Sequence, residues 1–446
     1  MSFERTKTTY ELEQVLLISE RLKDDVDLRR VVTDLEIYEN LDKPYLTAEM
    51  SVVDQTGFFE QTGIIGGERV EIDIVSLSEG GPNVTISKKF YVVKCDKRSV
   101  NDDAQLVIFN LIEDIGFISK LYNVNRAVSG KPGKILNTIA KEFFDRSVVE
   151  IGSEIQRFEA IIPNMNPLDA MRWISRRAAT SEGYPHYLYS TLVSDNSLYF
   201  NDLGRLLLEP VINPDQKFSN TQASLDNPLN KTIISHLFED NKTLLEFISR
   251  GLIGSQYEYI DTTQETTRKF SFNVIKDFLG PLVEAGILSE QENVEFSELY
   301  KVKEKSFNER PSRYITRIGG TNSNRDFFVD EDNNHTWTNS LYESKDAAGY
   351  KAQVIQQVMD TLLKKSPATF VMDGSNFIAG DRHLTVGCNI AVEFTKTNPD
   401  RDFSIDQIDT RRSGNYLIFA CRHMFKKEKY EVSLGCMKLG DLKRND

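Results

Sequence analysis

The sequence predicts an α+β fold that is mainly β, with antiparallel β units near both ends of the chain and small α/β regions between them. Three observations predict it. Segments in which apolar and polar residues alternate fill residues 1–118 and return in 366–446, as half-buried strands do. Turn residues separate them at roughly ten-residue spacing, which is typical of antiparallel barrels and sandwiches. Helical periodicity appears between the two ends. A chain of 446 residues exceeds one ordinary core, so we expect roughly two to four packed units.

The first β unit covers residues 1–118, and we expect strands within 184–255 to complete it. Gly-rich turns at 66–67 and 78–83 separate its segments. Within Val70–Val75, alternation directs Glu71 and Asp73 to the face opposite the apolar side chains. The strands of this unit are predicted at Leu28–Tyr38, Leu46–Val53, Val70–Val75, Phe90–Lys94 and Leu106–Ile112.

A small α/β domain is predicted over residues 119–183, where the period of the apolar residues changes. Lys131–Phe144 carries apolar residues at helical spacing and has Pro132 at its start. Asn166–Ala179 begins with an Asn suited to cap a helix and a Pro suited to its first turn. Three basic residues of this segment are expected to pair with neighbouring acids: Arg172, Arg176 and Arg177.

Strands are predicted again at Tyr184–Ser190 and Ser197–Asn201, followed by a polar loop over 211–231. Residues 256–365 form a variable mixed region. Its first part, to about residue 310, is predicted to be irregular with a short helix near Asp277–Gly286. Residues 345–365 have one apolar face and a Pro beyond their end, which predicts a helix.

The second β unit covers residues 366–446, with strands from 305–335 as a candidate addition. Strands are predicted at Leu384–Phe394, Gly414–Phe425 and Tyr430–Leu439. The charged turn Lys426–Lys429 joins the last two into a hairpin, and its tip charges are expected to contribute little to stability.

Composition excludes several classes of protein. The 54 Lys and Arg residues against 67 Asp and Glu residues give a net charge of −13, which argues against a protein whose main task is to hold nucleic acid or anionic lipid. No stretch approaches the roughly 18 apolar residues of a membrane span, and the charged N-terminus does not resemble a signal peptide. The four cysteines have no metal or redox spacing, and we interpret them as reduced thiols: Cys95, Cys388, Cys421 and Cys436.

No catalytic residue and no cofactor site is predicted. The Gly-rich segment Gly63–Val70 lacks the Lys and Ser or Thr of a phosphate-binding loop. The sequence contains no G-x-S-x-G motif, and no cysteine has a recognisable electropositive context.

One cluster of metal-ligating residue types shares the C-terminal β unit: Cys388, Cys421, His423 and Cys436. Cys421 and His423 are two residues apart, so on a strand they would share a face and a zinc site is geometrically allowed. Buried thiols beside an ordinary histidine are the simpler interpretation. We therefore predict no metal site.

Three stretches, in order along the chain, together resemble one protein family. NPLDAMRWISRRA leads into EGYPHYLYSTLVSDNSLYFNDLGRLL, and the next stretch has Gly251, Gly254, Ser255 and Asp261 in a matching pattern. The last stretch is SGNYLIFACRHMFKKEKYEVSL, with matching residues at Gly414, Tyr416, Leu417, His423 and Tyr430. They are similar to the central baseplate hub of contractile-tailed bacteriophages of the T4 type. The likeness covers roughly residues 25–120, 160–275 and 380–446, and 274–365 matches nothing in it.

The resemblance implies a structural, non-enzymatic protein with two related antiparallel β-barrel (tube-type) domains in each subunit. Three subunits would form a pseudo-sixfold ring that joins the sixfold tail tube to the threefold central spike and leaves a channel for DNA ejection. The implied partners are a homotrimer, the spike, the tail tube, surrounding baseplate wedge proteins and DNA that passes without specific binding or membrane insertion. The implied location is the baseplate of the virion tail, after synthesis in the host bacterial cytoplasm.

Within that ring, Glu71 and Asp73 are candidate acids of the channel wall or of a subunit interface, because an acidic wall would repel phosphate. Solvent exposure explains them equally well. Three alternatives remain: a hub or spike adaptor of a related contractile injection system, a tail-associated cell-wall-degrading enzyme, and a solitary carbohydrate- or receptor-binding protein. Trimer formation would separate the assembly proteins from a monomeric enzyme.

Overall fold

The computed structural model describes residues 10–239, 254–319 and 368–440 with gaps, and the pair 355–356. Within those ranges the described residues exclude 23, 60–62, 78–82, 102–103, 152–157, 181–183, 195–196, 222–230, 262–264, 274–276, 278–283, 285–300, 303–304, 307–312, 380–381, 396–407, 410–411 and 427–428. The fold is mainly antiparallel β with a few helices, so the predicted fold class is confirmed.

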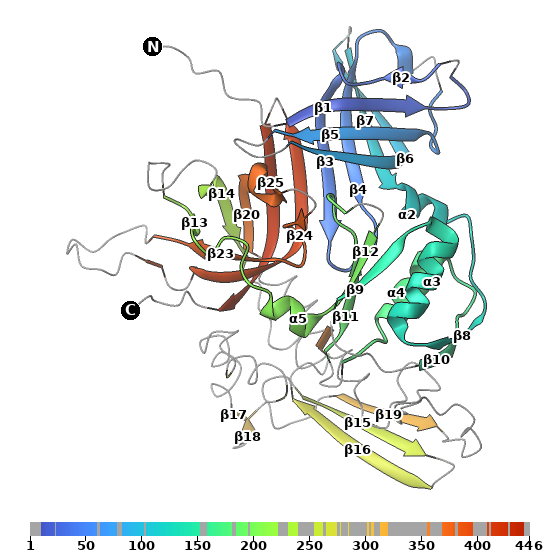
Figure 1. Ribbon diagram of the computed structural model, residues 1–446, viewed down its shortest axis with the longest axis vertical. Helices are drawn as coiled ribbons and strands as arrows, with labels where there is room; N and C mark the ends of the chain where they lie inside the picture. The colour runs from blue at the N-terminus through green and yellow to red at the C-terminus, as the bar shows by residue number, and fades with distance from the viewer. Residues whose placement is uncertain are drawn as a thin grey trace, which may run out of the picture.

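A 13-stranded sheet dominates the molecule (Figure 1). Its N-terminal strands are β1 (Tyr10–Ile18), β2 (Val26–Asp27), β3 (Val32–Asn40), β4 (Thr47–Asp54), β5 (Arg69–Ser76), β6 (Val84–Asn101) and β7 (Ala104–Glu113). Its later strands are β13 (Phe218–Ser219), β14 (Ser235–Phe238), β20 (Ala368–Asp373), β23 (Asn389–Glu393), β24 (Gly414–Lys426) and β25 (Lys429–Gly440). The order is β14-β20-β25-β24-β3-β4-β7-β6-β5-β1-β2, and off this path β23 pairs with β24 and β13 pairs with β23.

The predicted N-terminal strands all form, with shifted ends. Strand β6 is much longer than the predicted Phe90–Lys94. Strand β1 is missed by the sequence analysis, because a β-bulge between Leu12 and Gln14 interrupts the alternation. Tyr10 and Leu12 pack on the core before the bulge, and Val15 and Leu17 do so after it, so the apolar spacing is not regular.

The predicted C-terminal hairpin is confirmed, because β24 and β25 are paired from Asn415 opposite Gly440 to Lys426 opposite Lys429. The strand predicted at Leu384–Phe394 is too long, and β23 covers only its second half. Gly387 has a φ of 87°, and the amide of Cys388 donates to the carbonyl of Thr385 at 3.0 Å, which makes a turn there.

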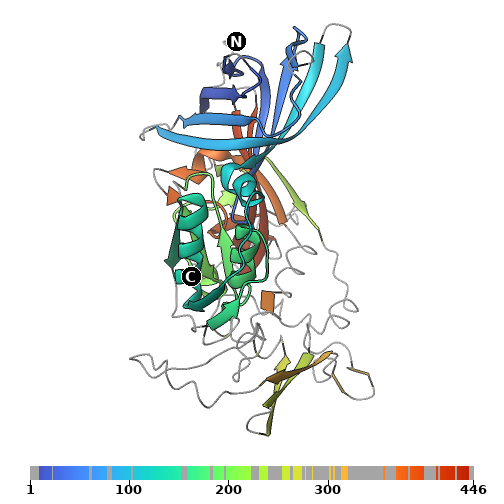
Figure 2. The same cartoon turned by 90° about the vertical axis from the view of Figure 1, so that its right-hand side faces the viewer.

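The α/β unit lies beside the large sheet, below its N-terminal strands (Figures 1 and 2). Its helices are α2 (Asp114–Ser119), α3 (Pro132–Phe144), α4 (Pro167–Ser175) and α5 (Leu203–Leu208), and its strands are β8 (Ala127–Gly130), β9 (Ser147–Ile151), β10 (Phe158–Ile161), β11 (His186–Tyr189) and β12 (Ser197–Asp202). Both predicted helices form. The Asn166 side chain accepts from the Asp169 amide at 2.9 Å, as the capping prediction requires, although α4 ends before Ala179.

Of the described residues, the strands beyond residue 183 do not complete the first β unit as expected. β11 and β12 join β9 in a three-stranded sheet, while β13 and β14 attach to C-terminal strands. The apolar residues of the α/β unit form a separate hydrophobic core, which includes Ile139, Met171 and Phe200. The larger core contains side chains of both predicted β units, so these units share one core as well as one sheet.

A separate three-stranded sheet lies at the opposite end of the molecule from β1 and β2 (Figure 1), with β15 (Gly254–Asp261) between β16 (Thr266–Asn273) and β19 (Arg313–Gly319). The irregular structure predicted from residue 256 is therefore wrong for the residues of β15 and β16, which are rich in polar and aromatic side chains. β19 also does not join the C-terminal β unit. The helices predicted at 277–286 and 345–365 lie almost entirely outside the described residues.

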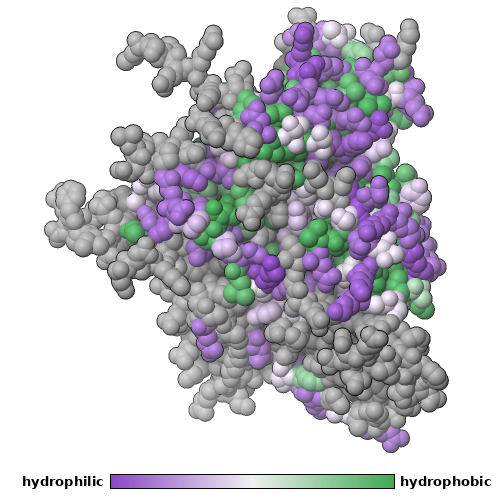
Figure 3. Space-filling model, in the orientation of Figure 1, coloured by the Kyte–Doolittle hydropathy of each residue, from purple (hydrophilic) through white to green (hydrophobic). Residues whose placement is uncertain are grey.

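Short elements complete the description: β17 (Lys301–Val302) with β18 (Lys305–Ser306), β21 (Ile378–Ala379) with β22 (Arg382–His383), and the 3₁₀ helix η4 (Gly374–Phe377). On the face drawn in Figure 3, hydrophilic side chains dominate the described surface and apolar ones form separate patches. No helix in the described part of the chain is long and apolar enough to cross a membrane.

Gly374 permits a close approach between η4 and β25. A Cβ atom added at this position would overlap the ring of Tyr430, which is itself fully buried. We expect Gly374→Ala to lower the free energy of unfolding by about 1–3 kcal/mol, as overpacking of a core does. Urea unfolding would measure it. A double variant with Tyr430→Ala is the control: the two losses should be less than additive, and full additivity would contradict the contact.

Candidate functional site

The N-terminal and C-terminal β units meet where β3 pairs with β24, and we call this pairing the seam. In its register Cys421 faces Glu39, Arg422 faces Tyr38 and His423 faces Ile37. Because strand side chains alternate, Glu39, Cys421 and His423 lie on the core face of the sheet. Glu36 and Arg422 lie on the other face, where they contact each other.

The core face of the seam holds a buried polar cluster of Glu39, Cys421, His423 and Tyr430. His423 Nε2 lies 3.0 Å from Glu39 Oε1, and His423 Nδ1 lies 2.7 Å from the hydroxyl of Tyr430 on β25. The side chains of Glu39 and His423 are completely buried. One ligand atom each from Glu39, Cys421 and His423 lies within 4.8 Å of the other two.

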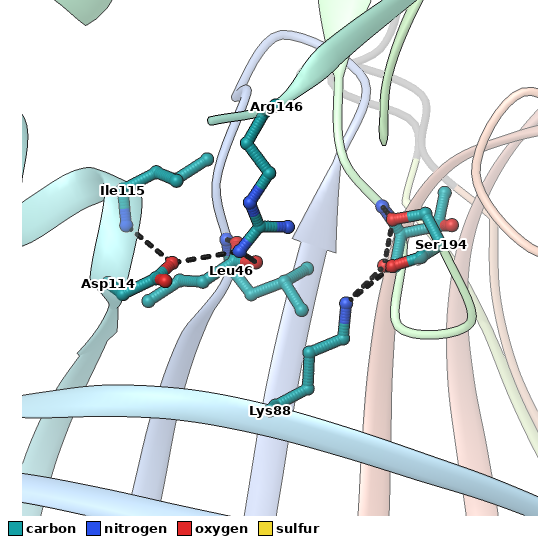
Figure 4. Close-up of polar contacts among 8 residues, drawn as sticks. Leu46, Lys88, Asp114, Ile115, Arg146 and Ser194 are labelled. Atoms are coloured by element: carbon teal, nitrogen blue, oxygen red, sulfur yellow. Dashed lines mark hydrogen bonds and ion pairs between the residues drawn. The ribbon is translucent and has the colours of Figure 1, made fainter. Parts of the chain in front are cut away.

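The buried cluster also anchors the loop between β11 and β12. Ser190, Thr191 and Leu192 of this loop are completely buried, so their backbone groups need partners inside the protein. The Leu192 amide donates to Glu39 Oε1 at 2.5 Å. From β6, the buried Lys88 donates to the carbonyl of Ser194 at 2.8 Å (Figure 4). Two ionisable side chains of the large sheet therefore hold a loop of the α/β unit.

Burial controls the charges of the cluster. Burial by itself would raise the pKa of Glu39, but the neighbouring His423 and hydrogen bonds to the carboxylate hold that pKa below its ordinary value. Burial raises the pKa of the Cys421 thiol and of the Tyr430 hydroxyl well above their usual ranges. Both groups are neutral at pH 7, so neither is an activated nucleophile. The arrangement suits structural or ion-binding chemistry, because these buried side chains are not exposed to a substrate in solution.

On the opposite face of the seam, Glu36 is held by two cations of β24. Its carboxylate lies 2.8 Å from Arg422 Nε and 2.6 Å from Lys426 Nζ, and the Tyr38 hydroxyl donates to it at 2.6 Å. Burial alone would raise the pKa of Glu36, but these three partners stabilise the carboxylate and lower its pKa to about 2. Lys426 is one of the turn charges that were expected to contribute little, and its contact with the buried Glu36 favours a larger contribution from this residue.

A second polar junction connects the α/β unit to the sheet (Figure 4). Glu113, at the end of β7 and fully buried, accepts from the Leu46 amide at 2.8 Å, and Arg146 lies 3.5 Å from its other oxygen. Arg146 also donates to Asp114 at 2.9 Å. These contacts tie the start of β9 to the junction of β7 and α2.

The predicted pairing of the α4 arginines is confirmed for two of the three. Arg172 and Arg176 both contact Asp42, and the Arg176–Asp42 distance is 2.9 Å. Their partner lies in the turn between β3 and β4 and not on the helix itself. Arg177 instead stacks over the Trp173 ring at 3.8 Å from its centroid.

The residues of the predicted motif lie in different sheets. Gly254 and the buried Ser255 open β15, Asp261 ends it, and Gly251 lies outside the described residues. Gly414 and Tyr416 lie in β24 of the large sheet, where the buried Tyr416 hydroxyl donates to the Arg412 carbonyl at 2.5 Å. The structure therefore does not bring these residues into one site.

Glu71 and Asp73 are half-buried and alternate with the buried Val70, Ile72 and Ile74, as predicted. Glu71 is partly neutralised by Arg69 at 3.2 Å and Lys89 at 4.0 Å. This face of β5 carries mixed charge, and its place in an assembly stays a prediction.

Cys421 and His423 share a face, as the sequence indicates, and the third ligand atom that lies within 4.8 Å of both belongs to Glu39. Sequence analysis missed Glu39 because it lies 384 residues from His423 along the chain. One signal was available: β3 places Glu39 in the same alternating row as the buried Leu35 and Ile37. An acid in an apolar row needs a partner inside the protein.

No family model matches the sequence, and no curated protein matches it. Among solved structures, the tail protein from Neisseria meningitidis MC58 is 11% identical, with a TM-score of 0.50 over 98% of this chain and 97% of that chain. The 43 kDa tail protein of prophage MuSo2 from Shewanella oneidensis is 11% identical, with a TM-score of 0.47 over 95% and 98%. The prophage tail protein gp18 from Listeria monocytogenes EGD-e is 9% identical, with a TM-score of 0.43 over 95% and 94%. The first of these shares the fold of this chain over nearly its whole length.

We expect acid to weaken the seam through Glu36. Its pKa is lower in the folded chain than the ordinary 4.5, so the stabilisation is complete above about pH 4.5 and is lost as the pH falls toward 2. Glu36→Gln should lower the free energy of unfolding by about 1–2 kcal/mol at pH 7, allowing for screening at the half-exposed cations. The difference from wild type should close between about pH 5 and pH 2 in urea titrations. The exposed Glu20→Gln is the control, and a pH-independent Glu36 effect would refute this origin.

Two lysines of the same hairpin should differ in their effects. Lys426→Met removes a cation 2.6 Å from Glu36 and should cost about 1–2 kcal/mol of stability, because a buried carboxylate loses a partner. Lys429→Met, at an exposed position of the same turn, should change stability by less than about 0.5 kcal/mol. Thermal unfolding of the two variants compares them directly. Equal effects would mean that Lys426 acts only as a surface charge.

Proposed function

We propose that this chain is a structural subunit of a contractile tail, acting as the central hub of the baseplate. The observation that carries the proposal is the fold shared with a bacterial tail protein over 98% of this chain and 97% of the other. The resemblance of three ordered sequence stretches to phage hub proteins supports it independently. A hub of a related contractile injection system would have the same geometry.

The continuous sheet suits a part that joins rings of different symmetry. Each subunit contributes two β units, so three subunits would present six β units to a sixfold tail tube and three to a threefold spike. The seam fixes one β unit against the other through paired strands and charged side chains. A rigid relation between the units is what a ring under the load of tail contraction requires. Baseplate wedge proteins would contact the outside of this ring.

An edge of the large sheet supports association of subunits. Among the strands that the structure describes, β14 is the last in its path and pairs with β20 on one side. Ile234 and Leu237 along this edge are 52% and 54% exposed. Exposed apolar residues on an edge strand favour pairing with another chain. We assign this edge to the contact between subunits.

A channel for DNA follows from the ring. The net charge of −13 per chain would keep its wall from retaining phosphate. Glu71 and Asp73 remain the candidate acids of the wall or of an interface. Arg69 and Lys89 partly offset the negative charge of Glu71. The clearest titratable cluster of the described residues is buried at the seam, which favours a structural role over an enzymatic one.

The trimer is tested by the mass of the purified chain in solution. Light scattering should give about three times the 51.0 kDa of one chain. Leu237→Asp should shift the mass to that of a monomer, because a charge would enter the apolar contact. Leu208→Asp, which alters a 66% exposed leucine on α5, should leave the trimer intact. A monomeric wild type, or a trimer that survives Leu237→Asp, would contradict the assignment of this edge.

A further inference from the structure

Three different metal-ligand types converge on the core face of the seam. Glu39 and Cys421 are directly opposite each other on paired strands, and His423 follows two residues later on the same face. A carboxylate oxygen, a thiol sulfur and an imidazole nitrogen lie within 4.8 Å of one another. These are the donor atoms that Zn²⁺ takes in proteins, and ligands of one tetrahedral ion lie within such distances.

The cluster contains polar atoms that the protein leaves without hydrogen bonds. Glu39 Oε2 is buried and accepts no hydrogen bond of normal geometry. The buried Thr385 hydroxyl likewise makes no hydrogen bond of normal geometry. An unsatisfied buried carboxylate oxygen is costly, and a cation between Glu39 and its neighbours would satisfy it.

We propose that Glu39, Cys421 and His423 bind a thiophilic divalent cation, Zn²⁺ being the best match. Three protein ligands leave the fourth tetrahedral position to a water or to the Thr385 hydroxyl. Zn²⁺ with one thiolate and one carboxylate carries no net charge, which suits a completely buried site.

The protons balance in a simple way. Binding releases the Cys421 thiol proton to solvent as the S–Zn bond forms. His423 Nε2 gives up its proton to solvent when it binds the ion, and Nδ1 carries the single proton of the neutral, bound imidazole. Nδ1 then donates to the Tyr430 hydroxyl, which is 2.7 Å away.

The surroundings already orient two of the ligands. Tyr430 fixes the His423 ring from β25, and the Leu192 amide fixes the Glu39 carboxylate from the β11–β12 loop. Partners of this kind orient the ligands of known metal sites and raise metal affinity. The ion would therefore join β3 and β24, whose neighbours β25 and the loop hold its ligands in place.

The test loads the site while the chain folds, because the cluster is buried in the folded protein. The full chain is produced in medium with Co²⁺, purified under reducing conditions, and analysed for metal content and visible absorption. We expect one Co²⁺ per chain, with a thiolate-to-cobalt charge-transfer band, and replacement by Zn²⁺ after refolding with Zn²⁺ present. Cys421→Ser should lose the charge-transfer band, whereas Cys95→Ser, which alters a half-buried thiol of β6, should keep it.

Two further variants identify the ligands and their support. Glu39→Gln should lower the bound Co²⁺ well below one per chain with little change of side-chain volume. Tyr430→Phe should keep the band but weaken Zn²⁺ binding by about 10–100-fold, the usual effect of removing an orienting partner. Circular dichroism identifies any variant that fails to fold. Folded wild-type protein without cobalt, or cobalt without a charge-transfer band, would overturn the proposal, as would a band unchanged in Cys421→Ser.

Discussion

Strand β24 pairs with β3 from Ala420 to Lys426, and through this pairing strands from the two ends of the chain become neighbours in one sheet. The rest of the structure depends on it. The C-terminal hairpin brings β20 and β14 to one side of the seam, and β4 leads to the other N-terminal strands. Without this pairing, the large core would divide into two smaller ones with an exposed edge strand each.

Charged groups on both faces make the register of the seam specific. Glu39 meets His423 inside the core, while Glu36 meets Arg422 on the outer face. A slip by one residue would turn every side chain of one strand to the other face and place Arg422 in the core. Leaving a buried charge without its partner costs about 3–5 kcal/mol, so the sheet tolerates one register.

The same residues connect the sheet to the α/β unit. Glu39 and Lys88 bind the backbone of the buried β11–β12 loop, and Glu113 and Arg146 make a second connection at the start of β9. The two hydrophobic cores are thus held together by polar groups that specify orientation. Such a body is suited to transmit force and to hold neighbours in a fixed geometry, which agrees with the structural role proposed for it.

Most of the local structure can be predicted from the sequence alone. Alternation identified most strands of the large sheet and the outward direction of Glu71 and Asp73, and helical spacing with the Asn166 cap identified α3 and α4. These features depend on residues near one another in the chain. Strand prediction failed where the alternation is broken, as at the bulge in β1, and where the strand residues are mainly polar, as in β15 and β16. Which strands are neighbours cannot be predicted in this way, because strand pairing joins segments that are far apart in the sequence and meet only when the chain is folded. For that reason Cys421 and His423 were visible as a pair, whereas Glu39, 384 residues from His423, joined them only in the folded chain.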